Sequence, residues 1–180
     1  MSTRGRRAGL ALLGLAGGLL LLFGGQAVYR WATFSRPIQS ALAGRPEVLA
    51  YRVDLQADPP VVRVRLAPVE QLEETVHALD DALAAALGGG CFRLEVEDRR
   101  DAELVRDYYR LNLVLAEGLA TGRFTAMEEQ AQRLAGQMGL ERLTLTVDAR
   151  HLYVTLVKGD HYLYQLVPRS AQCPGGVGSG

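Results

Sequence analysis

The clearest evidence of fold class in this chain is LTLTVDARHLYVTLVKGDHYLYQL, residues 143–166. Apolar and polar side chains alternate along it in three runs, and that period of two is typical of β-strands. Short turns near residues 149–150 and at residues 158–160 separate the runs, so we expect an antiparallel meander of three strands. We expect the following side chains to face inward: Leu143, Leu145, Val147, Leu152, Val154, Leu156, Tyr162, Tyr164 and Leu166.

Helical periodicity precedes the meander. Apolar stripes at helical spacing predict three helices over residues 68–87, 98–121 and 125–138, each followed by glycine. Asp98 is expected to cap the second helix, and Thr125 with Glu128 to form a capping box at the start of the third. A strand over residues 92–96 lies between the first two helices.

Two more strands open the domain, over residues 48–55 and 62–66, with Asp58-Pro59-Pro60 between them. Matching their apolar faces pairs Val53 with Val64 and places Asp54 opposite Arg63.

The element order therefore predicts an α+β domain, ββαβααβββ, over residues 48–168. Because apolar and polar residues alternate along each strand, we expect a two-layer sandwich with a mostly antiparallel sheet. Helices are expected to cover one face of this sheet, and the other face is expected to be exposed to water (the wet face). Residues 31–47 are expected to be a linker with a short helix around residues 38–43. Residues 169–180 are expected to be a disordered tail.

The N-terminal segment predicts the location of the protein. Residues 8–29 carry no charge, and they are long enough to span a bilayer as a helix. Arg4, Arg6 and Arg7 precede the segment, which favours a cytoplasmic N-terminus and an extracytoplasmic domain in the cell envelope. A cleaved signal peptide ending at Gly25-Gln26-Ala27, and hence a secreted protein, is the alternative.

Charge and cysteine content narrow the possible partners. The only charged residues among residues 1–30 are Arg4, Arg6, Arg7 and Arg30. Residues 31–180 therefore contain 16 of the 20 basic residues and all 20 acidic residues. The remaining net charge of −4 argues against nucleic-acid binding. Cys91 and Cys173 either form one disulfide after export or stay as two thiols.

Candidate chemistry is sparse. Glu73, His77 and Asp81 recur every four residues on the first helix, a spacing that offers three ligands to a divalent metal on one face. A solvated helix face explains the same spacing. No cofactor motif accompanies these residues: the glycines at residues 88–90 follow a helix, whereas phosphate loops precede one.

Three further sets of residues are candidates. Glu117, Asp148 and His151 are candidates for acid–base catalysis, although no serine or cysteine nucleophile pattern accompanies them. Arg123 precedes a helix and is a candidate for anion binding. Tyr109 and Tyr153 fall outside the apolar stripes and are expected to form an exposed aromatic patch for a partner.

These patterns lead to a functional expectation. A small anchored domain without a catalytic motif is expected to act as a non-enzymatic interaction or assembly module, with the lipid bilayer and either another protein or itself as partners. An exported acid–base hydrolase and an anchored sensor of small ligands are the alternatives.

Overall fold

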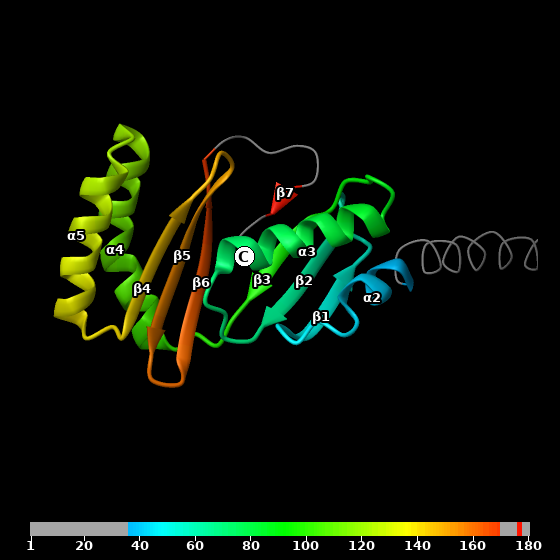
Figure 1. Cartoon of the computed structure of the whole chain (residues 1–180), viewed down its shortest axis with the longest axis horizontal. Coiled ribbons are helices and arrows are strands. Elements are labelled where there is room, and N and C mark those ends of the chain that lie inside the picture. Colours follow the sequence, from blue (N-terminus) through cyan, green and yellow to red (C-terminus); the bar gives the residue numbers. More distant parts are fainter. Residues whose placement is uncertain (1–35, 170–175, 178–180) are drawn as a thin grey trace, which may run out of the picture.

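The computed structural model describes residues 36–169 and 176–177, and they form an α+β fold (Figure 1). The predicted order ββαβααβββ is present, with a helix before it and a short strand after it. The elements are α2 (Arg36–Leu42), β1 (Val48–Asp54), β2 (Val61–Leu66), α3 (Leu72–Ala86), β3 (Arg93–Glu97), α4 (Ala102–Thr121), α5 (Phe124–Met138), β4 (Arg142–Val147), β5 (His151–Lys158), β6 (His161–Pro168) and β7 (Gly176–Val177).

The strands form two sheets, whereas the sequence suggested one. The first has the order β1-β2-β3-β7, with β1 antiparallel to β2 and the other pairs parallel. The second is the antiparallel meander β4-β5-β6. In Figure 1, α3 runs along the first sheet, and α4 and α5 lie together on the outer side of the second.

The first sheet has the predicted contrast between its faces. Its inner face packs Val62, Val64 and Leu94 against α3 in one buried core. Its outer face is charged: the Arg63 Nε lies 2.7 Å from the Glu95 carboxylate, and Arg65 pairs with Glu97 in the same way at 3.1 Å.

The predicted register of β1 against β2 is wrong by two residues. Val53 lies opposite Val62, and Asp54 lies opposite Val61. Arg63 lies opposite Arg52 on β1 and takes its acidic partner from β3 instead. A register shifted by two keeps the same side chains inward, so the apolar pattern alone did not distinguish the two registers.

Other elements pack against both faces of the second sheet, whereas the sequence suggested that one face was wet. Leu152, Val154 and Leu163 pack against α4 and α5, whereas Tyr153 and Tyr164 belong to the core that contains α3. The tyrosines of β6 therefore face away from the leucines of β5, opposite to the prediction. Apolar residues occur on both faces of β6, with Leu163 and Val167 on one face and Tyr162, Tyr164 and Leu166 on the other, so alternation did not identify a single inner face.

Tyrosine hydroxyls connect the second sheet to the end of β2. Tyr162 donates a hydrogen bond to the Leu66 carbonyl at 2.6 Å, and Tyr164 donates to the Ala67 carbonyl at 3.2 Å. These bonds satisfy polar atoms that are taken out of water where the two sheets meet.

The helix ends agree in part with the sequence. Gly122 and Gly139 end α4 and α5 in the left-handed conformation, as expected. Asp101, not Asp98, caps α4 by accepting from the Leu104 amide at 2.7 Å. The Thr125 capping box is also wrong, because α5 begins at Phe124 without a side-chain cap.

The linker and tail contribute to the fold where they are described. Ile38 and Leu42 of α2 are buried in the core with α3, and residues 176–177 pair with β3. Cys91 is exposed, and Cys173 lies outside the described residues. None of the helices in residues 36–169 is long and apolar enough to cross a membrane, and the expected span at residues 8–29 also lies outside the description.

Candidate functional site

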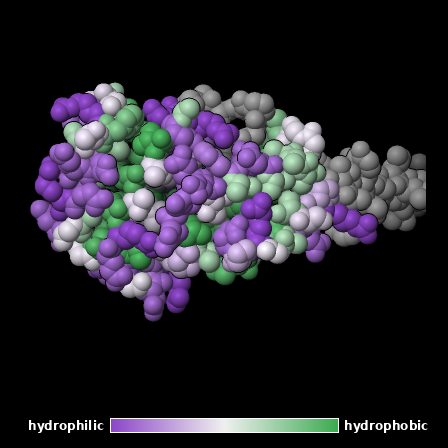
Figure 2. Space-filling model, in the orientation of Figure 1, coloured by the Kyte–Doolittle hydropathy of each residue, from purple (hydrophilic) through white to green (hydrophobic). Residues whose placement is uncertain are grey.

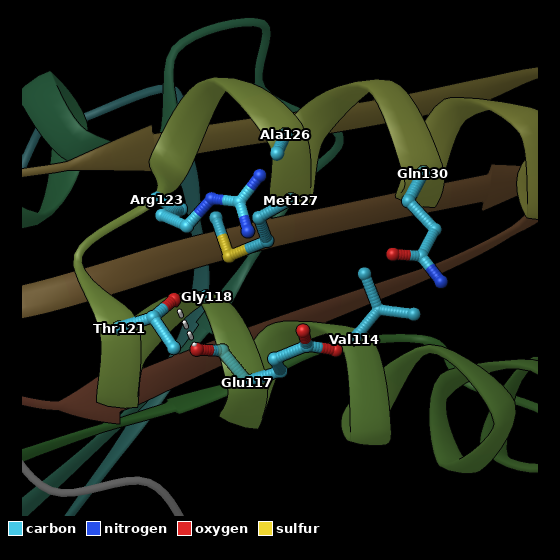
Figure 3. Close-up of a pocket in the computed structure, with 8 residues that line it drawn as sticks. All are labelled: Val114, Glu117, Gly118, Thr121, Arg123, Ala126, Met127 and Gln130. Carbon is cyan, nitrogen blue, oxygen red and sulfur yellow. Dashed lines mark hydrogen bonds between the residues drawn. The ribbon is translucent and has the colours of Figure 1, made fainter.

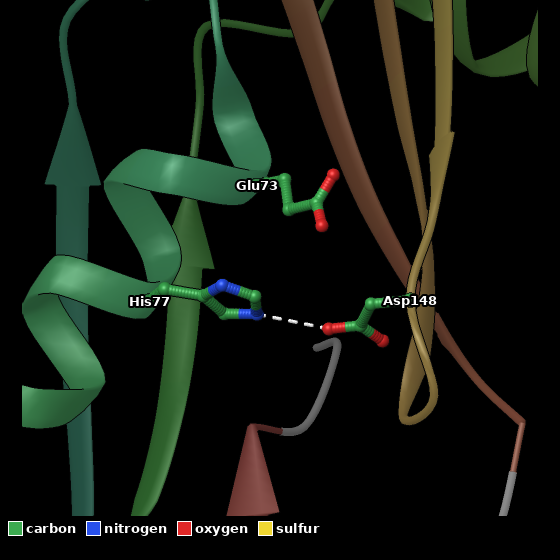
Figure 4. Close-up of side chains that lie close together, drawn as sticks. All are labelled: Glu73, His77 and Asp148. Carbon is green, nitrogen blue, oxygen red and sulfur yellow. Dashed lines mark hydrogen bonds and ion pairs between the residues drawn. The ribbon is translucent and has the colours of Figure 1, made fainter.

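A cluster of potential metal ligands lies between α3 and the turn that joins β4 to β5. Its members are Glu73 and His77 of α3 and Asp148 of the turn, and one ligand atom from each lies within 4.8 Å of the other two. Figure 4 shows the three side chains pointing into the same space. We refer to this group as the Glu73–His77–Asp148 cluster.

Local structure explains how the three side chains are aimed. Glu73 and His77 are four residues apart on α3, so they lie on one side of the helix. Asp148 begins the turn, and its Oδ1 accepts hydrogen bonds from the amides of Arg150 at 2.6 Å and His151 at 2.5 Å. Those bonds hold the carboxylate in place, and the other oxygen, Oδ2, lies beside His77.

A buried tyrosine, Tyr153, contacts two members of the cluster. The Tyr153 hydroxyl donates to Asp148 Oδ2 at 3.0 Å and lies 3.1 Å from His77 Nε2, which is itself 2.8 Å from Asp148 Oδ2. The His151 Nδ1 lies 3.5 Å from the same hydroxyl. Two histidines, a carboxylate and a phenol therefore form a continuous polar network between α3 and the second sheet.

The network favours an ionised carboxylate beside a neutral phenol. Burial raises the pKa of Asp148, but hydrogen bonds from the His151 amide, His77, the Arg150 amide and Tyr153 outweigh that effect and lower its pKa to about 2. Burial, followed by the hydrogen bond and negative charge of Asp148, raises the pKa of Tyr153. At neutral pH, Asp148 is therefore an anion and Tyr153 a hydrogen-bond donor.

A buried carboxylate lies near the cluster. Asp80 of α3 is buried, and its Oδ2 pairs with Arg150 at 3.5 Å. Burial raises the pKa of Asp80, and Arg150 partly opposes that effect. The positive charge of Arg150 is thus engaged by Asp80 beside the turn that carries Asp148.

The metal candidates are only partly brought together. Glu73 and His77 belong to the cluster, as their helical spacing suggested, whereas Asp81 is exposed and outside it. Asp148 takes the third place. It is 71 residues from His77 in the sequence, so only the packing of α3 against the turn could reveal this partner.

The acid–base candidates do not share one cleft. Asp148 and His151 are adjacent, but the His151 side chain is buried with Tyr153 on the α3 side of the second sheet. Glu117 is exposed on α4, which packs against the opposite face. This separation removes the geometric basis for a catalytic set of Glu117, Asp148 and His151.

Glu117 and Arg123 instead line a cavity of about 110 Å³ between α4 and α5. Figure 3 shows them on opposite walls, Glu117 on α4 and Arg123 at the start of α5, with Met127 between the helices. A carboxylate in the same small cavity disfavours a bound anion. Anion binding by Arg123 stays a prediction.

The two tyrosines expected on the surface differ in exposure. The Tyr109 residue is 70% exposed, and the neighbouring Leu113, one helical turn on, is 78% exposed. Tyr153 is only 1% exposed, so its place in an exposed patch is wrong. It is buried because α3 covers the sheet face that the sequence pattern suggested was wet.

Comparison with known proteins adds no functional information. No family model, curated protein or solved structure matches this chain. The functional proposals therefore rest on the geometry of the described residues and on the sequence.

Proposed function

We propose that this chain is a single-pass membrane-anchored protein of the cell envelope whose extracytoplasmic α+β domain is a non-enzymatic assembly module. We propose further that it assembles with a second copy of itself through the outward face of α4. The observation that carries this proposal is a row of exposed apolar residues on that helix.

The row, which we call the α4 seam, consists of Tyr109, Leu113, Ala116 and Ala120, all of them exposed. Their spacing of four, three and four residues is that of the seam of a coiled coil. The opposite side of α4 carries Leu104, Leu111 and Leu115 into the core, so this helix is apolar on two sides. A second apolar side on a surface helix is characteristic of a helix that packs against a partner.

The helix beside α4 provides a contrast. The exposed positions of α5 are almost all polar or charged, and hydrophilic residues cover the α5 end of the molecule in Figure 2. Those positions are Thr125, Glu128, Glu129, Gln130, Gln132, Arg133, Gly136 and Gln137. Exposed apolar side chains are thus a property of α4 and not of this helical layer in general.

Charge complementarity favours a second copy as the partner. Arg110 and Glu117 are exposed and each follows a seam residue, so both flank the same edge of the seam. In an antiparallel pair of α4 helices related by a twofold axis near residues 113–116, Arg110 of each copy approaches Glu117 of the other. The small side chains of Ala116 and Ala120 permit close approach of the two helices.

The proposed anchor supports self-association. Two copies held in one membrane by residues 8–29 would meet at a higher effective concentration than free domains. Modest contacts along a single helix would then be sufficient for pairing.

Charge reversal along the seam edge tests this proposal. We expect the full-length chain in detergent to be a dimer by light scattering, and expect Arg110→Glu or Glu117→Arg to reduce the dimer fraction by placing like charges together. The double variant Arg110→Glu with Glu117→Arg should restore the dimer, because the pair is complementary again.

Glu129→Arg, at an exposed position of α5, is the matched control and should leave the dimer fraction unchanged. A purely monomeric chain, or single reversals that have no more effect than this control, would contradict self-association through α4.

A further inference from the structure

We infer that the Glu73–His77–Asp148 cluster binds a divalent transition-metal ion of the zinc class. This inference concerns a different surface from the α4 seam and does not depend on self-association. It rests on the donor set, on the way Asp148 is held and on the access of solvent to the cluster.

The donor set selects the class of ion. One imidazole nitrogen and two carboxylate oxygens lie within 4.8 Å of one another, so small side-chain rotations bring all three to a common centre. Imidazole is a ligand for zinc and its neighbours in the transition series, whereas Mg²⁺ and Ca²⁺ prefer oxygen ligands alone. The two carboxylates supply the negative charge that offsets a divalent cation.

Hydrogen bonds that metal binding would leave intact hold the Asp148 carboxylate in position. Its Oδ1 accepts from two turn amides, and its Oδ2 accepts from the Tyr153 hydroxyl. Ligating carboxylates in metal sites are commonly oriented by outer hydrogen bonds of this kind. The ion would take the place of the proton between His77 Nε2 and Asp148 Oδ2, which are 2.8 Å apart.

The cluster is open to the solvent on one side. The His77 side chain is 37% exposed and that of Asp148 is 15% exposed, so an ion has a path of entry. Three protein ligands leave at least one coordination position for water, unlike the four ligands of closed structural zinc sites. The nearby cation Arg150 pairs with Asp80, which reduces its repulsion of an incoming ion.

Metal binding would connect α3 to the second sheet. Glu73 and His77 belong to the helix that covers the first sheet, and Asp148 belongs to the second sheet's turn. An ion bound to all three would therefore stabilise the folded state, because the unfolded chain does not hold these ligands together.

Equilibrium dialysis of the full-length chain against ZnCl₂, after removal of metal with EDTA, tests the inference. A Cys91→Ser, Cys173→Ser background removes thiol ligands from the measurement. We expect one zinc per chain and a higher Tm with zinc than without. Glu73→Gln and His77→Gln should each weaken zinc binding by at least about tenfold, since each removes a ligand.

Two controls make the result specific to the cluster. Asp81→Asn removes the carboxylate that helical spacing alone suggested, and His161→Gln removes a half-buried histidine outside the cluster; both should bind zinc as the parent does. Cobalt(II) in place of zinc should give visible absorption bands that Glu73→Gln alters. Absence of stoichiometric binding, or binding lost in the controls but kept in Glu73→Gln, would overturn the inference.

Discussion

At the scale of single residues, Asp148 shows how a turn aspartate acquires a central role. Its position after a strand is typical of a polar turn residue, and the sequence also made it a candidate for acid–base catalysis with Glu117 and His151. In the fold, two amides, His77 and Tyr153 surround its carboxylate. Three of these four partners are local in sequence, but His77 comes from α3 and reaches Asp148 only through tertiary packing.

Asp148 should make the stability of the domain depend on acid pH. Its pKa in the folded state is lowered to about 2 from an ordinary value of 3.8, so it stabilises the fold above about pH 4. That contribution should be lost as the pH falls from about 4 to about 2. Urea unfolding of the parent and of Asp148→Asn over this range measures the effect.

The variant should have a flatter dependence on pH than the parent, and Asp81→Asn, at an exposed site, should retain the parent's slope. Identical slopes for Asp148→Asn and the parent would show that the hydrogen bonds around Asp148 do not influence folding.

At the scale of elements, the contact between α4 and α5 depends on a glycine. A Cβ built at Gly118 would lie 2.6 Å from the Met127 Cβ, closer than non-bonded carbon atoms approach one another. The sequence pattern marked the glycines that end helices but offered no reason for one inside α4. Only the position of α5 explains it.

Gly118→Ala should therefore destabilise the domain, although alanine is the better helix former. We expect a loss of about 1–3 kcal/mol in the free energy of unfolding, because the Cβ forces the two helices apart. Gly136→Ala, inside α5 with open space around it, is the matched control and should be neutral or stabilising by up to about 1 kcal/mol. Chemical denaturation of both variants measures the two changes in the free energy of unfolding. Equal changes would contradict the close contact between α4 and α5 at Gly118.

At the scale of the whole molecule, the folded unit begins before the first strand. Ile38 and Leu42 of α2 are buried with α3 and the tyrosines of β6, although residues 31–47 had the composition of a linker. The sequence predicted a short helix near this position, but two buried side chains in seven residues are too few to predict that it packs into the core.

Ile38→Ala should lower the free energy of unfolding by about 2–5 kcal/mol, because it leaves a cavity at a fully buried position. Gln39→Ala, at an exposed position of the same helix, should change stability by less than about 0.5 kcal/mol. Denaturant unfolding of the two variants measures the difference. Equal stabilities would mean that α2 is not part of the cooperative unit.

The α+β class, the order of helices and strands and the glycines that end α4 and α5 could all be predicted from the sequence. These features follow from local periodicity and backbone preference, which act over a few residues. Three features became visible only in the folded chain: the strands form two sheets, Tyr153 is buried, and Asp148 lies beside Glu73 and His77. Each face of the second sheet carries buried apolar side chains, and which elements cover these side chains depends on contacts between residues far apart in the chain, which local sequence patterns do not encode.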